Sequence, residues 1–566
     1  MMRPWWCAYR KGTISHMGSL LDADLVWGLS LPSAYPHPLD DVTTLQTHIS
    51  RIFFAGDFVY KVKKPLDTGY LDFRTLDQRL HFCEEEVRLN KRLSPDVYLG
   101  VSPIYLVDGS LRVGEPGEPD ESDGFGEPVE YAVKMRRLPR ARSLETLAQT
   151  GALTGGQVEA VARTIAGFHS QADRPDVSPV EAIAVARRNL EENIAQTAGH
   201  VGHALSSERY DDLSAYCTAF LEAHGAALGR RAAEGRFLEG HGDLHSSNVF
   251  LDDGVQIIDC IEFNRRFRVL DAADEIAFLL MDLERLGRAD LSAVLMREYS
   301  QAARDDLSGA PMAHYRTYRA WVRGKVTATL ADSGLDYADW VSASSLARAY
   351  FELAHGYVMD AVNARPRLIA VAGFIGCGKS TLAGELSRRW GIHSVSSDIT
   401  RKQLAGLEPN RRGDSGYEEG IYSPDFTDKT YDQMLGEARK HLARGASVVV
   451  DASFARARHR SQFAEVASDA GADAWLLECV ATIDETRSRL ARRAVRPETT
   501  PSDARWETYL SQRTTWERIG DNEPLRHAVI DSASGRHQTV KEALLVLFTW
   551  TLDAAPSATP SAARDN

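Results

Sequence analysis

The stretch that decides the fold of the second half of the chain reads Gly373-Phe374-Ile375-Gly376-Cys377-Gly378-Lys379-Ser380. It has the spacing G-x-x-x-x-G-K-[ST], follows an apolar run at 368–372 and opens a helical pattern that ends near 390. Glycines at this spacing let backbone N–H groups turn inward around phosphate oxygens, and the start of a helix adds partial positive charge. Lysine then reaches the β- and γ-phosphates of ATP and serine ligates Mg²⁺. The predicted nucleotide-binding residues are Gly373, Gly376, Gly378, Lys379, Ser380 and Thr381, with Ser380 also a metal ligand.

The segments around this loop alternate between strand and helix patterns. Alternation of this kind predicts a parallel sheet with crossover helices, which is an α/β P-loop NTPase domain. A purely structural glycine turn is the alternative, and the strand–loop–helix context argues against it. The expected elements are Leu368–Ala372, Ser380–Trp390, Asp428–Arg444, Ser447–Val450, Arg458–Ala470, Ala474–Cys479 and Ile483–Arg493.

A polar segment downstream, Ser396-Ser397-Asp398-Ile399-Thr400-Arg401-Lys402, resembles the small P-loop kinases, especially the kinase domain of polynucleotide kinases. The resemblance implies that Asp398 accepts the proton of the substrate hydroxyl and that Arg401 holds an anionic group. The apolar run Val448–Val450, which leads into Asp451, resembles the second acidic strand of these kinases. The resemblance implies that Asp451 lies near the metal ion. The arginines of the helix at 483–493 resemble a lid that neutralises the transferring phosphoryl group, and Arg493 matches the lid position best. A solvated basic helix face is the alternative for these arginines.

A second polar constellation lies in the first half of the chain. The run Gly240-His241-Gly242-Asp243-Leu244-His245-Ser246-Ser247-Asn248 precedes Asp259, which ends an apolar segment. Phosphoryl transfer needs a carboxylate for the attacking hydroxyl and hard oxygen ligands for the magnesium that bridges the ATP phosphates. Asp243 fits the first role, Asn248 and Asp259 fit the second, and His241 would brace the loop.

Residues from about 40 to 350 resemble the aminoglycoside phosphotransferase and choline kinase superfamily on this motif. The resemblance implies an α+β, two-lobed, protein-kinase-like domain. It makes Lys61 the lysine of the ATP phosphates, with Lys63 as the alternate on the same strand face. It also implies that Glu86, in preference to Glu85, orients that lysine, and that Met135 lies at the hinge that holds the adenine.

Two features depart from the superfamily pattern. A G-x-G-x-x-G loop is missing before Lys61, where the sequence reads Thr47-His48-Ile49-Ser50. The segment after Asp259 carries Glu275 at the second acidic place of the usual D-P-x-x-D. These changes concern the identity of the substrate more than the nucleotide chemistry.

The resemblances and the breaks in composition together predict four parts. They are an N-terminal extension at 1–39, the phosphotransferase-like domain at 40–362, the P-loop kinase or ATP-binding domain at 367–553 and a disordered tail at 554–566. A chain of 566 residues is long enough for two such domains. The order resembles bacterial bifunctional proteins that fuse these two domain types. The start of the chain has two candidates, Met1 and Met17.

Composition narrows the classes of function. Hydrophobic residues make up 43% and charged residues 26%, which is ordinary for a globular chain. The net charge of −13 argues against a general nucleic-acid coat or a binder of anionic membranes. The apolar runs are too short to cross a bilayer. Six cysteines without a C-x-x-C pair favour a reduced, cytoplasmic protein.

The leading prediction is a bifunctional kinase that uses ATP and Mg²⁺ at two sites to phosphorylate hydroxyl groups of small molecules. One alternative makes the P-loop domain a regulatory ATP-binding module. Another has it phosphorylate the 5′-hydroxyl ends of nucleic acids, which the acidic net charge disfavours. The sequence predicts no membrane partner and leaves the acceptors and the oligomeric state open.

Overall fold

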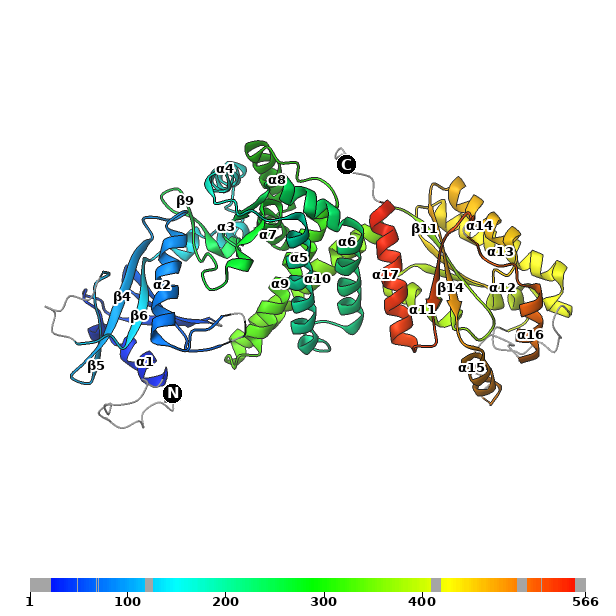
Figure 1. Cartoon of the computed structure of the whole chain (residues 1–566), viewed down its shortest axis with the longest axis horizontal. Helices are drawn as coiled ribbons and strands as arrows, with labels where there is room; N and C mark the ends of the chain where they lie inside the picture. Colours follow the sequence, from blue (N-terminus) through cyan, green and yellow to red (C-terminus); the bar gives the residue numbers. More distant parts are fainter. Residues whose placement is uncertain are drawn as a thin grey trace. The chain divides into compact units, whose positions relative to one another are not determined.

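The computed structural model describes residues 22–47, 49–67, 69, 71–117, 126–408, 419–495, 506–520 and 522–554. The chain forms two compact units. The first unit comprises Met1–Asn189 and Ala226–Leu353, and the second comprises Leu190–Gly225 and Ala354–Asn566. The following paragraphs describe each unit by itself (Figure 1).

The first unit begins with a six-stranded antiparallel sheet of order β1-β2-β3-β6-β4-β5. Apolar runs at 52–54 and 58–63 flank an Ala55-Gly56-Asp57 turn and predict a hairpin. It is present: β2 and β3 pair with Phe53 opposite Tyr60. Both aromatic rings lie in a buried cluster with Leu25 and Leu29 of helix α1 (Asp22–Leu29). The strands are β1 (Val42–Gln46), β2 (Ser50–Ala55), β3 (Phe58–Lys63), β4 (Tyr98–Val107), β5 (Ser110–Val113) and β6 (Glu130–Arg136).

Helix α2 (Leu76–Asn90) packs against this sheet and brings a carboxylate to β3. Its first turn is fixed by a capping box, in which the Thr75 hydroxyl accepts from the Gln78 N–H and the Gln78 side chain accepts from the Thr75 N–H. The sequence pattern at 76–93 predicts a helix that extends to Leu93, but α2 ends at Asn90, and the N–H groups of Arg92 and Leu93 bond carbonyls three residues back. The proline at position 95 disfavours helical geometry at Ser94, so the helix does not continue beyond this turn.

The rest of the first unit is mainly helical, with two short antiparallel strand pairs. β7 (Phe237–Glu239) pairs with β10 (Val269–Asp271), and β8 (Val249–Leu251) pairs with β9 (Val255–Ile257). These pairs frame the 240–248 run, whose Leu244 belongs to the buried core. The helices are α3 (Leu144–Gln149), α4 (Gly155–Gln171), α7 (Ala272–Arg285), α8 (Ala289–Ala303) and α9 (Ala310–Ala331), while α5 (Pro179–Thr197), α6 (Ser207–Ala233) and α10 (Tyr337–Asn363) have residues in both units.

The second unit contains the predicted parallel sheet. Five strands lie in the order β12-β13-β11-β14-β15, and every neighbouring pair is parallel. The strands are β11 (Arg367–Ala372), β12 (His393–Ser396), β13 (Val448–Asp451), β14 (Asp473–Val480) and β15 (Arg526–Asp531). The helices of this unit after α10 are α11 (Lys379–Trp390), α12 (Ser397–Leu404), α13 (Pro424–Leu442), α14 (Ala457–Asp469), α15 (Ile483–Val495), α16 (Trp506–Thr515) and α17 (Arg536–Ala554).

The predicted strands and helices of this unit are present, with shifts at their ends. α13 begins at Pro424 rather than at Asp428, because Ser423 caps it and proline suits the first helical position. The segment 114–128, rich in Gly, Pro, Glu and Asp, predicts a solvated loop between two strands. Residues 118–125 of this loop, and 555–566 of the tail predicted at 554–566, lie outside the described residues. Among the helices that the structure describes, none combines the length and the apolar character needed to span a bilayer.

Candidate active sites

A row of paired lysines and carboxylates connects strand β3 of the first unit to helix α2 and to the segment at 259–262. Lys61, on β3, donates to Glu86 Oε1 of α2 at 2.8 Å and also to Asp259. The other oxygen of Glu86 accepts from Lys63 Nζ at 2.8 Å, and Lys63 also donates to Glu262. The two lysines are two residues apart and therefore lie on the same face of β3. Both candidates for the phosphate lysine thus share one carboxylate, and Lys61 is the one bonded to the predicted metal ligand.

The pKa values in this row of lysines and carboxylates follow from its pairing. Burial alone would raise the pKa of Glu86, but Lys61 and Lys63 outweigh it and hold that pKa at about 2. Burial would lower the pKa of Lys61, and the charges of Asp259 and Glu86 raise it above the usual lysine value instead. Lys61 and Glu86 are therefore ionised at neutral pH, which is the state that binding of a triphosphate requires.

The loop that carries the candidate base Asp243 is fixed by hydrogen bonds to Glu275 of α7. The Glu275 carboxylate accepts the backbone N–H of His241 at 2.7 Å and that of Gly242 at 2.6 Å. His169 Nε2 lies 2.8 Å from the other carboxylate oxygen. His241 in turn bonds the carbonyl of Ile258 through Nε2 at 2.9 Å, so its ring braces the loop against the segment that leads to Asp259.

Asp243 and its neighbours form the centre of this site. Its carboxylate lies 3.4 Å from His245 Nε2, and its side chain is 30% exposed, which leaves it accessible. Burial would raise the pKa of Asp243, but His245, Arg323 and His241 outweigh it and keep that pKa below its usual range. Asp243 is therefore ionised at neutral pH, as a group that accepts a hydroxyl proton must be.

The two candidate metal ligands of the first unit are brought together by the β8–β9 pair. Asn248 accepts the N–H of Ile258 through its backbone carbonyl at 3.0 Å, and its side-chain amide donates to the Asp243 carbonyl at 3.0 Å. Asp259 follows with φ of +68°, a left-handed conformation that aspartate tolerates better than most residues. Its backbone N–H donates to the Tyr98 hydroxyl at 3.0 Å, and its side chain is 46% exposed. An amide oxygen and a half-exposed carboxylate at one edge suit a magnesium ion bound with ATP.

The predicted hinge residue lies on β6. Met135 is buried opposite Tyr98 of β4 and Val59 of β3, in one apolar cluster with them. It therefore lies near the end of the strand that neighbours β3, the strand that carries Lys61.

The loop at 373–380 has the backbone shape that its glycines predict. Gly373, Gly376 and Gly378 have φ of +134°, +83° and +104°. A Cβ at Gly373 would lie 2.3 Å from the Cys479 carbonyl oxygen, so no other residue fits there without a shift. Lys379 Nζ donates to the Phe374 carbonyl at 2.9 Å, back across the loop.

Polar groups from neighbouring strand ends converge on this loop. Asp451 ends β13, Ser396 ends β12, and these two residues lie opposite each other in the parallel register. Burial raises the pKa of Asp451, while Lys379 and hydrogen bonds from Ser380 and Ser396 lower it and Asp398 adds to the rise. A buried carboxylate bonded to the serine of the loop and facing a lysine is a donor set that fits Mg²⁺ with a triphosphate.

The arginines predicted for this site have different surroundings. Arg401 of α12 is buried and donates to the carbonyl of Ile421 at 2.7 Å and to Thr427 at 3.1 Å. Arg489 of α15 donates to the Cys377 carbonyl at 3.2 Å, so it touches the phosphate loop itself. The side chain of Arg493 lies outside the described residues.

Comparisons with known proteins show which family the chain belongs to. Residues 113–321 match the family described as "Phosphotransferase enzyme family", and residues 368–518 match an "AAA domain". The Mycobacterium tuberculosis protein "Uncharacterized protein Rv2004c" is 32% identical over 464 residues, which is 81% of this chain and 88% of the relative. A Mycobacterium bovis protein, "Uncharacterized protein Mb2027c", gives the same values. The chain belongs to their family.

This chain joins an aminoglycoside phosphotransferase-type domain to a P-loop kinase domain, so the resemblance inferred from the motifs is confirmed. The chain is a kinase, and its two kinase-type domains imply ATP-dependent phosphoryl transfer. Among solved structures, a gluconokinase from Sinorhizobium meliloti is 20% identical, with a TM-score of 0.24, over 33% of this chain and 96% of that one.

Three residues that the sequence analysis gave no role lie in these sites. Glu262 pairs with Lys63, and His169 pairs with Glu275. Arg323 of α9 faces Asp243 electrostatically, and its Nε is buried without a hydrogen-bond partner among the described residues. None of the three has a local sequence signal, whereas Arg489, which contacts the phosphate loop, belongs to the lid-like arginines of 483–493.

Proposed function

We propose that the chain is a bifunctional ATP-dependent phosphotransferase in which each domain transfers the γ-phosphoryl group of ATP to a hydroxyl group of a small molecule. The observation that carries the proposal is that each unit combines a buried lysine suited to phosphates with a carboxylate that can act as a base. In the first unit Lys61 bonds Asp259, and Asp259 and the proposed base Asp243 both act on His241; in the second unit Lys379 interacts with Asp398. A site that only binds nucleotide would not need the carboxylate.

In the first domain, Asp243 accepts the proton of the acceptor hydroxyl as the bond to the γ-phosphorus forms. Lys61, oriented by Glu86, holds the phosphates, and Met135 lies where the adenine would bind. Mg²⁺ held by Asn248 and Asp259 would neutralise charge on the phosphates. The sheet with α2 then acts as the nucleotide lobe and the helices after α3 as the acceptor lobe of a protein-kinase-like domain.

In the second domain, the roles fall on the residues around the 373–380 loop. Its backbone N–H groups and Lys379 bind the β- and γ-phosphates. Ser380 and Asp451 would hold Mg²⁺, which supplies the same charge neutralisation. Asp398 accepts the proton of the second acceptor. Arg401 binds its anionic group and Arg493 acts as the lid.

The test uses the full-length chain with γ-labelled ATP and a fractionated metabolite extract, with labelled products identified by mass spectrometry. Positioned proton acceptance contributes about 10²–10⁴-fold. Asp243→Asn should therefore remove one set of labelled products and Asp398→Asn a different set, while both variants still bind ATP in calorimetry. If both variants label the same products as the unaltered chain, the proposal is wrong.

A regulatory role for the second domain is the competing function, and one contact favours it. Arg389, at the end of the helix that begins with the phosphate loop, donates to Asp211 at 3.1 Å and to Asp212 at 3.2 Å. Both aspartates belong to α6, which continues beyond Gly225 into residues of the first unit. Regulation predicts that Lys379→Ala lowers labelling by the first domain although no product depends on Asp398.

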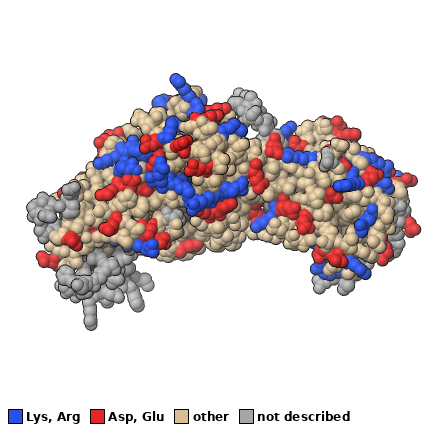
Figure 2. All heavy atoms as spheres, viewed as in Figure 1, with Lys and Arg blue, Asp and Glu red and all other residues tan. Residues whose placement is uncertain are grey.

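Nucleic-acid end phosphorylation is less well supported. Acidic side chains lie among the basic ones on the face drawn in Figure 2, and the net charge is −13. A nucleic-acid substrate would bind with a steep salt dependence. We also propose a cytoplasmic location, where the buried free cysteines would stay reduced.

A further inference from the structure

Two histidines and a glutamate gather in the second unit away from the phosphate loop. His393 is the first residue of β12, and Glu437 and His441 lie on α13. In the parallel register His393 lies beside Val448, at the start of β13, whereas the phosphate loop follows the other end of the neighbouring strand β11. The three side chains are therefore separate from the residues assigned to ATP and Mg²⁺.

The geometry of the three side chains suits a shared cation. One ligand atom from each residue lies within 4.8 Å of the others. His393 Nε2 is 2.8 Å from Glu437 Oε1. The rings of His393 and His441 lie with centroids 4.1 Å and planes 11° apart, so one ring must turn for the in-plane lone pairs of both to meet at one ion. Glu437 and His441 are four residues apart on α13, so they project from the same helix face.

The position of His441 on its helix favours a bound cation. His441 lies in the last turn of α13, where the helix dipole stabilises positive charge.

We propose that His393, Glu437 and His441 bind a divalent transition-metal ion of the zinc class. Two imidazoles and one carboxylate are ligands that Zn²⁺ accepts, whereas Mg²⁺ prefers oxygen alone. Zinc–nitrogen bonds are about 2.0–2.1 Å long, so the three side chains would have to rotate to bring their ligand atoms, now within 4.8 Å of one another, closer together. The ion would replace the contact between His393 and Glu437 and leave a coordination position for water.

The proposed ion would connect the edge strand β12, through His393, to helix α13, through Glu437 and His441. β12 is the outer strand next to β13, and α13 contacts both strands. β12 ends at Ser396, and α12, which carries Asp398, begins at the next residue. A bound ion would therefore stiffen the strand that precedes the proposed base, while its binding does not depend on the proposed kinase activity.

The test is zinc titration of the full-length chain, stripped with a chelator and kept in excess Mg²⁺, by calorimetry and by metal analysis after gel filtration. The expected result is one zinc ion per chain at this site. His393→Ala, Glu437→Gln and His441→Ala should each weaken binding at least about tenfold, since even changes to outer-shell partners cost about 10–100-fold. Cobalt should give a visible absorption band that His441→Ala removes.

A matched control is His527→Ala. His527 pairs with Glu478 at 3.1 Å in the same unit, without belonging to a three-ligand group among the described residues. This variant should bind zinc like the unaltered chain. The proposal fails if the unaltered chain binds no zinc at this stoichiometry, or if the three ligand variants, folded by circular dichroism, bind it as well as His527→Ala does.

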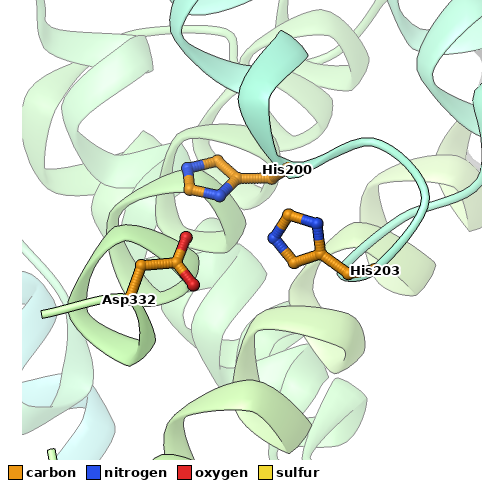
Figure 3. Close-up of side chains that lie close together, drawn as sticks. All are labelled: His200, His203 and Asp332. Atoms are coloured by element: carbon orange, nitrogen blue, oxygen red, sulfur yellow. The ribbon is translucent and has the colours of Figure 1, made fainter. Parts of the chain in front are cut away.

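Figure 3 shows a further pair of imidazoles, His200 and His203, with ring centroids 5.7 Å apart. Asp332 in the same view belongs to the first unit. The pair supplies only two ligands from the second unit, so His200→Ala serves as a second control. If that variant removes the zinc ion and His441→Ala does not, the site is assigned to the wrong histidines.

Discussion

Replacing Glu275 by glutamine tests how the loop of the first candidate base is held. The carboxylate accepts backbone N–H groups from His241 and Gly242 and a third bond from His169, and its side chain is fully buried. In Glu275→Gln, the amide oxygen can still accept both backbone N–H groups, but it carries no charge. Because hydrogen bonds to an ionised acceptor are roughly twice as strong as neutral ones, the loop is held less tightly.

The pKa of Glu275 gives the size of the effect. Burial would raise this pKa, but the bond from His169, the charge of His241 and the N–H of Gly242 hold it at about 2, against the ordinary 4.5. A difference of this size corresponds to about 3 kcal/mol between the ionised and neutral carboxyl. Breaking a buried charged contact usually costs about 3–5 kcal/mol. About 3 kcal/mol is about a 100-fold change in the opening equilibrium of the loop.

Hydrogen exchange measured by mass spectrometry on peptides that cover 238–248 reads this equilibrium directly. The amides of His241 and Gly242 should exchange about 100-fold faster in Glu275→Gln. Glu284→Gln is the control, because Glu284 lies on the same helix and pairs with Arg316 at 2.8 Å. Equal exchange of the loop in the unaltered chain and in folded Glu275→Gln would refute the reasoning.

The pH dependence of stability checks the same carboxylate independently. Because the folded-state pKa of Glu275 lies below 4.5, its stabilising contribution is complete above that pH and is lost as the pH falls from 4.5 toward 2. The difference in urea midpoint between the unaltered chain and Glu275→Gln should therefore shrink below about pH 5. A difference that grows on acidification would contradict this assignment.

Three other substitutions test the remaining contacts. Lys61→Met should lower turnover by the first domain at least about 10²-fold without changing the circular dichroism spectrum, because it removes a charge aimed at the phosphates; unchanged labelling would contradict its role. Gly373→Ala should weaken ATP binding to the second domain at least about tenfold in calorimetry, whereas Gly384→Ala, which has open space for a Cβ, should not. Arg389→Ala removes one partner of two buried aspartates of α6, which keep His355, His537 and Lys541, and should destabilise the second unit by about 1–3 kcal/mol in thermal unfolding; the exposed Arg388→Ala should cost much less.

The sequence predicted best those features that local patterns determine. The phosphate loop depends on three glycines within six residues, and the parallel sheet follows from alternating segments. The β2–β3 hairpin likewise depends on a short turn at Gly56. In each case the residues that carry the signal are close together in the sequence, so the periodicity and turn chemistry are sufficient.

The contacts that hold the first site could not be predicted in this way. Lys63 meets Glu262 across 199 residues, and His169 meets Glu275 across 106. Each partner taken alone has the pattern of an ordinary charged or capping residue. Tertiary packing alone brings them together, and a single sequence carries no signal for that pairing.

In both candidate sites the proposed phosphate lysine has an acceptor within this chain. Lys61 is bonded to Glu86 and Asp259, and Lys379 is bonded to the Phe374 carbonyl with Asp451 nearby. Binding of a triphosphate would exchange one acceptor for another, so we expect a smaller net gain from each lysine than from an unpaired cation. In the second site we then expect the backbone N–H groups of the phosphate loop to supply more of the affinity. In the first site, whose sequence has no G-x-G-x-x-G before Lys61, we expect a larger share from the proposed metal ligands Asn248 and Asp259. ATP affinity of the first domain should accordingly depend more steeply on Mg²⁺ concentration than that of the second.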